Sequence, residues 1–196
     1  MKGTDNQRYV VKSGDLPDCY PTHLHEAQFW ENLGRVVASF GFLEEVLAKA
    51  IFAFTATQEH SEDKIEAEFE KWLPTLERAL SDPLGGLIDT YGKAVRTNSN
   101  ATIVNLNDLL SDLREASKLR NVLCHGSWRA PDENCASVPF FVNRQKQRFD
   151  TSIDVAFLKQ AQRHISDLIC AIINSVTHMG WQFPGTGGPG KEVWSK

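Results

Sequence analysis

The sequence lacks the features that carry disulfides, zinc centres or membrane insertion. Its four cysteines are scattered without a C-x-x-C pair, which argues against a disulfide framework or a zinc site and favours a reducing, cytoplasmic environment. The most apolar stretch, residues 36–54, is interrupted by Glu44, Glu45 and Lys49, so it does not predict a membrane span. Residues 1–15 contain no apolar core of the kind found in signal peptides.

Positive charge is also scarce. The formal net charge is −4, whereas proteins that bind nucleic acids over a broad surface are usually basic. Any contact with RNA must therefore use a local patch. The chain contains no Walker A loop and no G-x-S-x-G motif. We expect it to use neither a cofactor nor a metal ion.

What the sequence does have is apolar residues at helical spacing over most of its length. This spacing predicts helices at about residues 22–57, 61–80, 84–96, 100–125 and 154–179. A chain of 196 residues is long enough for one domain with a substantial core. The expected fold class is all-α, an antiparallel helical bundle of about five helices.

One segment breaks the helical pattern. Between the last two long helices, the sequence reads as strand, turn and strand, which predicts a short β-hairpin insertion at about residues 127–149. The domain organisation that we predict is an N-terminal arm at 1–21, a helical domain at 22–181 and a flexible Gly/Pro-rich tail at 182–196.

The most informative helix is the one that ends before Gly126. One of its faces is polar and ends in a histidine. The residues of this polar face are Asn107, Ser111, Arg114, Lys118, Asn121 and His125. Arg120 lies on the opposite, apolar face between Leu113 and Cys124. An arginine there either points into a cleft or pairs with a buried acid, because an unpaired buried charge is costly.

The end of this helix has the residues of a possible site. Asn121 and His125 are four residues apart, so their side chains are neighbours on a helix. Arg120 and His125 are five residues apart, about 140° around a straight helix. Only the long side chain of Arg120, or a distorted last helical turn, would bring Arg120 and His125 to one ligand. A histidine that exchanges protons near a permanent cation suits phosphodiester chemistry; alternatively, His125 caps the helix and Arg120 forms a structural salt bridge.

The first helix offers a partner for Arg120. Glu44 interrupts a seven-residue row that is otherwise apolar, with Trp30, Val37 and Ile51. We predict that Glu44 pairs with Arg120. The alternative is a rotated helix on which Glu44 faces water.

Positive charge is concentrated only downstream of His125. Arg144, Lys146 and Arg148 are spaced by two, so they would share one face of a strand. They could clamp a phosphate backbone, or they could protect an edge strand against pairing. With the polar helix face, the candidate RNA-binding residues are Arg114, Lys118, Arg129, Arg144, Lys146 and Arg148.

The run from Arg120 to His125, R-N-V-L-C-H, resembles the R-x4-6-H motif of the HEPN superfamily. A polar residue commonly follows the arginine in that motif, as Asn121 does here. The resemblance implies a small all-α fold over roughly Thr22 to Trp181. It also implies a metal-independent endoribonuclease of the kind found in toxin–antitoxin, abortive-infection and RNA-processing systems, and an acidic residue near the motif, which fits Glu44.

The same resemblance implies roles and partners. His125 would act as general base or acid, Arg120 would stabilise charge on the phosphate, and Asn121 would orient the histidine or the substrate. The expected partners are RNA, a second copy of the chain in a homodimer, and a cognate antitoxin protein. One HEPN subgroup carries a tyrosine two residues after the histidine; Ser127 occupies that position here, so modification of such a tyrosine does not carry over.

Two other functions stay open. The chain could be a non-catalytic HEPN-like module that binds RNA or protein, with Arg120 held structurally by Glu44. It could also be a ligand-binding helical regulator, although no motif supports this. The exposure of His125 discriminates between the ribonuclease and the non-catalytic module, because a catalytic His125 must reach solvent whereas a structural one can be fully packed.

Overall fold

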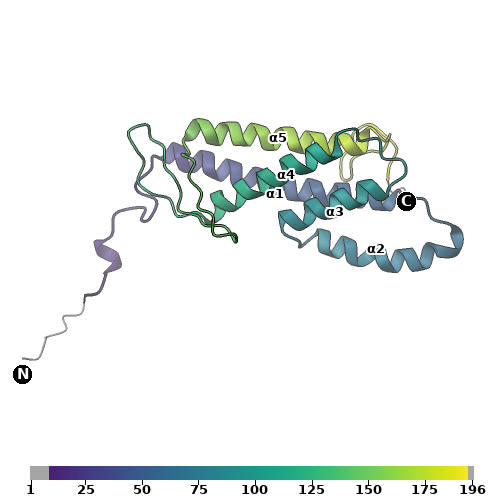
Figure 1. Cartoon of the computed structure of the whole chain (residues 1–196), viewed down its shortest axis with the longest axis horizontal. Coiled ribbons are helices and arrows are strands. Elements are labelled where there is room, and N and C mark those ends of the chain that lie inside the picture. The colour runs from purple at the N-terminus through teal and green to yellow at the C-terminus, as the bar shows by residue number, and fades with distance from the viewer. Residues whose placement is uncertain (1–8, 194–196) are drawn as a thin grey trace, which may run out of the picture.

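A computed structural model describes residues 9–193 of the chain. Five α-helices follow one another, with two short 3-10 turns. They are η1 (Ser13–Asp15), α1 (Ala27–Ala56), η2 (Glu62–Lys64), α2 (Ile65–Ala79), α3 (Leu84–Thr97), α4 (Leu106–His125) and α5 (Val155–Thr177). Successive helices run in opposite directions along the long axis (Figure 1). The prediction of an all-α bundle of about five helices is confirmed for the described residues.

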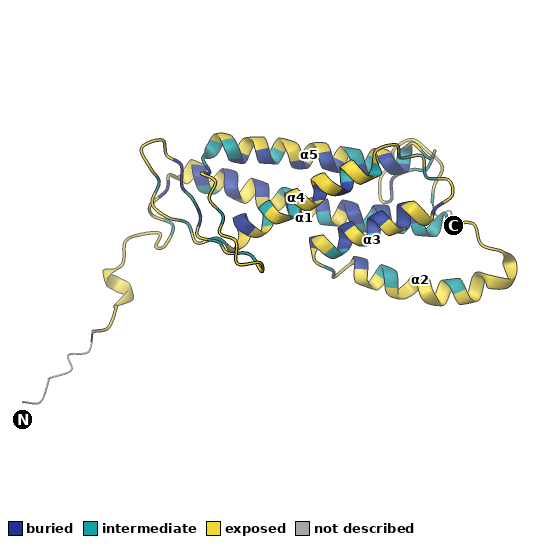
Figure 2. Cartoon of the chain, in the orientation of Figure 1, coloured by how far each residue is buried: buried dark blue, intermediate teal, exposed yellow. Residues whose placement is uncertain are grey.

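Helix α1 is the centre of the bundle and packs mainly against α5 and α3. Its apolar residues recur every three or four positions, so one face is continuously buried (Figure 2). Phe40, Leu43 and Phe54 are at most 1% exposed. The core also contains Tyr91, whose hydroxyl donates to Ser175 Oγ at 2.9 Å. Burial raises the pKa of Tyr91 to about 12, so the hydroxyl is a neutral donor at physiological pH.

Helices α1, α2 and α4 begin four to six residues later than the sequence pattern predicts. Helix α1 begins at Ala27 because Thr22 is in a turn, where its carbonyl accepts a hydrogen bond of 2.8 Å from Trp30 Nε1. Helix α4 begins at Leu106, not near residue 100. The cause is the buried Asn98 side chain, which donates to the carbonyl of Phe54 at 2.8 Å and accepts from the backbone N–H of residue 100 at 2.9 Å. These contacts hold the preceding loop in a non-helical turn.

The predicted β-hairpin at 127–149 is wrong. The α4–α5 loop, residues 126–154, contains no strand and only isolated antiparallel bridges. These bridges join Ser127 to Phe140, Ser137 to Ile153 and Val142 to Arg148. Residues 137–142 change partner from one bridge to the next, so no two adjacent residue pairs form a ladder. Each bridge therefore stays a single pair.

The prediction that Arg144, Lys146 and Arg148 share one face of a strand is also wrong. Residues 143–147 form a turn, in which Asn143 Oδ1 accepts from the backbone N–H of Gln147 at 2.9 Å. Arg144 lies in this turn, and Lys146 has a left-handed backbone with φ of 62°. Only Arg148 belongs to an antiparallel bridge. The three cations therefore do not share a face.

The segment predicted as a flexible tail is partly packed on the bundle. Residues 180–191 form a loop that is closed by backbone hydrogen bonds between Lys191 and both Gly180 and Gln182. Phe183, within this loop, is 4% exposed. Residues 1–8 of the predicted arm and 194–196 of the predicted tail lie outside the described residues. None of the helices in residues 9–193 has an apolar stretch long enough to cross a membrane.

Candidate functional site

Arg120 and Glu44 meet between α4 and α1. Arg120 Nη2 lies 3.5 Å from Glu44 Oε1, and each side chain is 29% exposed. The prediction that these two residues pair is therefore confirmed. Glu44 Oε1 is buried and accepts no hydrogen bond from the described residues, so the attraction between the two side chains is mainly electrostatic. The positive charge of Arg120 offsets the cost of burying this carboxylate oxygen.

Asn121 extends this pair towards solvent. Its side chain is exposed, and its Oδ1 accepts a hydrogen bond of 3.4 Å from Arg120 Nη1. The guanidinium of Arg120 is thus contacted by a carboxylate on one side and an amide on the other. Its orientation is restrained without being sealed from water.

His125 is the last residue of α4 and is exposed. The last turn of the helix is regular, because the N–H of Gly126 donates to the carbonyl of Val122 at 2.8 Å. The imidazole makes no hydrogen bond or ion pair with the residues that the structure describes. A side chain in this position is free to contact a ligand, as a catalytic histidine must be.

Arg120 and His125 do not converge within one chain. A regular helix separates them by about 140°, and no distortion of the last turn reduces this angle. Arg120 faces α1, whereas His125 ends the polar face with Asn121 one turn before it. The structure thus brings Arg120 together with Glu44 and Asn121, and it leaves His125 apart from them on the surface.

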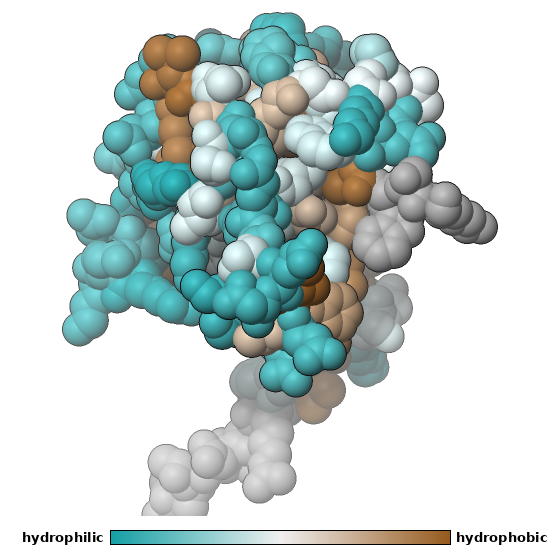
Figure 3. Space-filling view, turned by 90° about the vertical axis from the view of Figure 1, so that its right-hand side faces the viewer, coloured by the Kyte–Doolittle hydropathy of each residue, from teal (hydrophilic) through white to brown (hydrophobic). Residues whose placement is uncertain are grey.

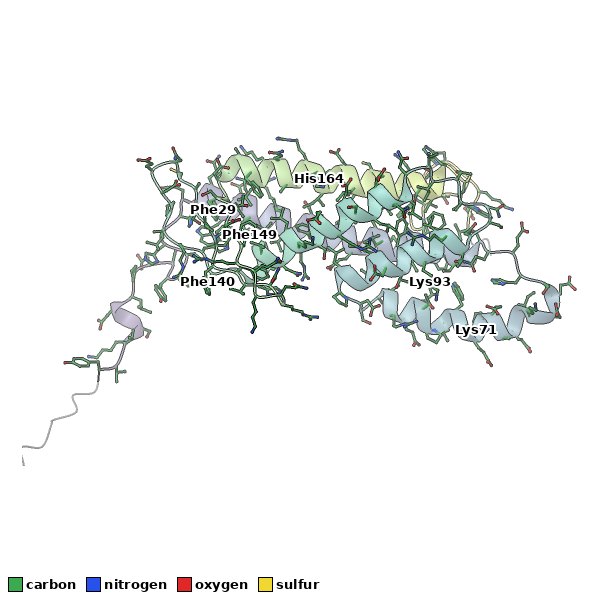
Figure 4. The ribbon with its side chains drawn as sticks, in the orientation of Figure 1. Phe29, Lys71, Lys93, Phe140, Phe149 and His164 are labelled. Carbon is green, nitrogen blue, oxygen red and sulfur yellow. The ribbon has the colours of Figure 1, made fainter. Side chains whose placement is uncertain are left out.

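A cationic and aromatic cluster lies close to His125 along the loop. The guanidinium carbons of Arg129 and Arg148 lie 5.4 Å and 5.6 Å from the centroid of the Phe140 ring. Phe140 itself is 45% exposed, and its backbone pairs with Ser127, two residues after His125. We call Arg129, Phe140 and Arg148 the Phe140 cluster. Figure 4 shows Phe140 at the same end of the molecule as Phe29 and Phe149.

The other predicted RNA-binding residues do not join this cluster. Arg114 is paired with Asp89 at 2.9 Å, and Lys118 with Glu115 at 2.6 Å, all four side chains being exposed. Arg144 and Lys146 are exposed in the turn at 143–147. Two of the six predicted cations, Arg129 and Arg148, therefore form a compact site.

A buried histidine that the sequence did not reveal holds the loop in place. His25 is 9% exposed, and its ring stacks on Phe29 with centroids 4.1 Å apart. Its Nε2 lies 2.9 Å from the carbonyl oxygen of Arg129 and 3.2 Å from Ser137 Oγ. A carbonyl oxygen only accepts, so Nε2 must carry the hydrogen. Trp128 packs edge-on against both His25 and Phe29.

His25 thus positions the backbone that carries the Phe140 cluster. The sequence contains no local signal for this role, because the hydrogen bonds of His25 are made to residues more than a hundred positions away. Within residues 9–193, no group of three or more His, Cys, Asp or Glu side chains is arranged to hold a metal ion.

Comparison of the chain with protein-family models, with curated proteins and with solved structures gave no significant match.

Proposed function

We propose that this protein is a metal-independent endoribonuclease of HEPN type that acts in the cytoplasm, in a toxin or phage-defence system. The observation that carries the proposal is an exposed, unpaired His125 at the end of α4, followed along the chain by the cationic Phe140 cluster. The Arg120–Glu44 pair lies one to two turns before this histidine. Together these groups supply a proton acceptor, a fixed cation and a surface for an RNA strand.

The proposed reaction is an internal transfer at one phosphodiester. His125 removes the proton from a ribose 2′-hydroxyl, the 2′-oxygen forms a bond to phosphorus, and the bond from phosphorus to the 5′-oxygen breaks. A protonated histidine returns a proton to the departing 5′-oxygen. The products are a 2′,3′-cyclic phosphate and a 5′-hydroxyl. Arg120 stabilises the extra negative charge on the phosphate, and Asn121 orients His125 or the substrate.

A homodimer makes this chemistry feasible. Arg120 and His125 are directed apart by about 140° in a single chain, so one copy does not present both to the same phosphate. Two copies of α4 that line one cleft would supply a second histidine and a second arginine. In such a dimer, one histidine can serve as base while the other serves as acid.

The Phe140 cluster provides the contact to RNA that an acidic chain needs. Arg129 and Arg148 can neutralise phosphates, and the exposed ring of Phe140 can stack on a base. This local patch reconciles RNA binding with a net charge of −4. RNA bound at this cluster would lie on the loop that follows His125, where the backbone of Phe140 pairs with Ser127.

A second candidate function is a non-catalytic HEPN-like module that binds RNA or a protein such as an antitoxin. The pairing of Arg120 with Glu44 favours it, because an arginine that balances a partly buried acid can be purely structural. In that case RNA would bind the Phe140 cluster without being cleaved.

The test is to incubate the purified full chain with total cellular RNA in excess EDTA and to map the new ends. The proposal predicts cleavage with 2′,3′-cyclic phosphate ends that is unaffected by the chelator. Binding without cleavage would support the non-catalytic module. Cleavage that requires a divalent metal ion, or that leaves 5′-phosphate ends, would contradict the proposed mechanism.

A further inference from the structure

Helix α2 presents an apolar face that the other residues of the described range, 9–193, leave largely exposed. Ile65, Phe69, Leu73 and Leu80 are 53%, 55%, 46% and 85% exposed. At 100° per residue they fall within about 80° of one another, so they form a single row, which we call the α2 stripe. Figure 2 shows α2 exposed along most of its length, unlike α1 and α5. A contiguous exposed apolar row on a helix is the usual mark of a binding surface.

The α2 stripe lies beside the side chain that attaches the helix to the bundle. Trp72 packs on Phe52, with centroids 5.9 Å apart, and its Nε1 donates to Thr55 Oγ1 at 2.8 Å. A groove of about 530 Å³ lies beside this attachment and is lined in part by Ile65, Phe69 and Trp72. Brown hydrophobic surface is visible among hydrophilic side chains at the end of the molecule where α2 begins (Figure 3).

Carboxylates border the α2 stripe. Glu66, Glu70 and Glu77 are spaced by four and seven residues, so they form a row next to the stripe on its solvent side. All three are exposed, and none belongs to an ion pair within the described part of the chain. The surface therefore combines an apolar row with an unneutralised acidic border.

We propose that the α2 stripe and its glutamate border bind a basic amphipathic helix of a partner protein. Apolar side chains of the partner would cover Ile65, Phe69 and Leu73, and its lysine or arginine side chains would pair with the glutamate row. The negative charge of the glutamate row favours a basic partner helix over a second copy of the chain or an anionic membrane. A second copy of α2 would bring two acidic rows together, and an anionic membrane would be repelled in the same way.

The partner would leave the candidate site open. Lys71 on α2 and Phe140 in the α4–α5 loop lie towards opposite ends of the molecule (Figure 4). A helix on the α2 stripe would therefore not cover His125. The proposal is independent of whether the chain cleaves RNA.

Two synthetic peptides test the proposal. Both have the 15-residue length of α2 and a leucine row at helical spacing; one has lysines on the borders of that row and the other has glutamates. Isothermal titration with the full chain should show that the lysine peptide binds about tenfold or more tightly than the glutamate peptide. Phe69→Ala should weaken the lysine peptide about tenfold, whereas Phe42→Ala on α1, where the ring is 50% exposed, should not.

Charge reversal gives a result that loss of folding cannot mimic. The triple variant Glu66→Lys, Glu70→Lys, Glu77→Lys should prefer the glutamate peptide. A control triple, Asp108→Lys, Asp112→Lys, Glu133→Lys, has the same net charge at other exposed positions and should keep the original preference. Equal affinity of the wild-type chain for both peptides would overturn the proposal.

Two further measurements test the other occupants of the α2 stripe. A dimer of the wild-type chain that Phe69→Ala dissociates, measured by light scattering after gel filtration, would assign the α2 stripe to a second copy. Binding to phosphatidylserine vesicles that Phe69→Ala abolishes would assign it to a lipid surface. Either result would overturn the proposal of a basic partner helix.

Discussion

The α4–α5 loop and helix α2 lie at different ends of the bundle and are built in opposite ways (Figure 1). Each exposes a phenylalanine to solvent, Phe140 at 45% and Phe69 at 55%. The ring in the loop is flanked by two arginines, whereas the ring on α2 lies beside a row of glutamates. Similar apolar side chains thus lie in surroundings of opposite charge.

The two regions also differ in how they are attached. The loop has no regular structure, yet the buried His25 fixes it through hydrogen bonds to Arg129 and Ser137 and through aromatic packing. Helix α2 is regular, yet its main polar anchor is the single hydrogen bond of Trp72. Internal contacts therefore position the loop, which fits the proposed catalytic role, whereas the apolar row of α2 stays exposed, which fits the proposed external partner.

The largest effect on stability is expected at the anchor of the loop. His25→Ala removes a buried ring and leaves the carbonyl of Arg129 without its donor, so it should lower the free energy of unfolding by about 2–4 kcal/mol. Urea denaturation measures this change. His23→Ala, at an exposed position, is the control and should change stability by no more than about 0.5 kcal/mol. Equal effects of the two substitutions would show that His25 does not anchor the loop.

The next effect concerns RNA affinity. Phe140→Ala removes the ring that Arg129 and Arg148 contact and should weaken binding of single-stranded RNA by about 1–3 kcal/mol. Val142→Ala, where the side chain is 46% exposed, is the matched control and should have little effect. Fluorescence anisotropy with a labelled oligonucleotide compares them. Indistinguishable affinities would mean that the ring does not contact RNA.

A smaller effect is expected from the Arg120–Glu44 pair. The two side chains are partly exposed and 3.5 Å apart, so a double-mutant cycle of Arg120→Ala and Glu44→Ala should give a coupling energy of about 1 kcal/mol. Thermal or urea unfolding of the wild-type chain, the two single variants and the double variant measures this coupling energy. Strictly additive losses would reject the pairing.

The smallest effect is expected on α2. Phe69→Ala should change the free energy of unfolding by no more than about 0.5 kcal/mol, because the ring is already 55% exposed. The same substitution weakens peptide binding in our proposal. A loss as large as that of His25→Ala would mean that Phe69 supports the fold, and the contrast between the two regions would disappear.

Sequence periodicity predicted the parts of the structure that depend on local patterns. It located the five helices, with three starts four to six residues too early, and it identified Glu44 as the partner of Arg120 from one acid in an apolar row. It failed at the predicted hairpin, because the alternation of apolar residues does not show that residues 137–142 pair with three different segments. It also could not find His25, whose role depends on Arg129 and Ser137 far along the chain.

Periodicity also could not show that the apolar face of α2 is uncovered. The spacing of Ile65, Phe69 and Leu73 predicts an amphipathic helix in either case. Only the tertiary structure shows that Trp72 is the side chain that packs on α1, which leaves the α2 stripe exposed.

The most direct test of the central claim is to compare His125→Ala with His164→Ala in the RNA cleavage assay with EDTA. Both histidines are exposed, and His164 lies on α5, a different helix from the motif (Figure 4). We predict that His125→Ala lowers the cleavage rate by about a hundredfold or more, with unchanged thermal stability, and that His164→Ala cleaves like the wild-type chain. Full activity of His125→Ala would contradict the assignment of this histidine and of the ribonuclease site around it.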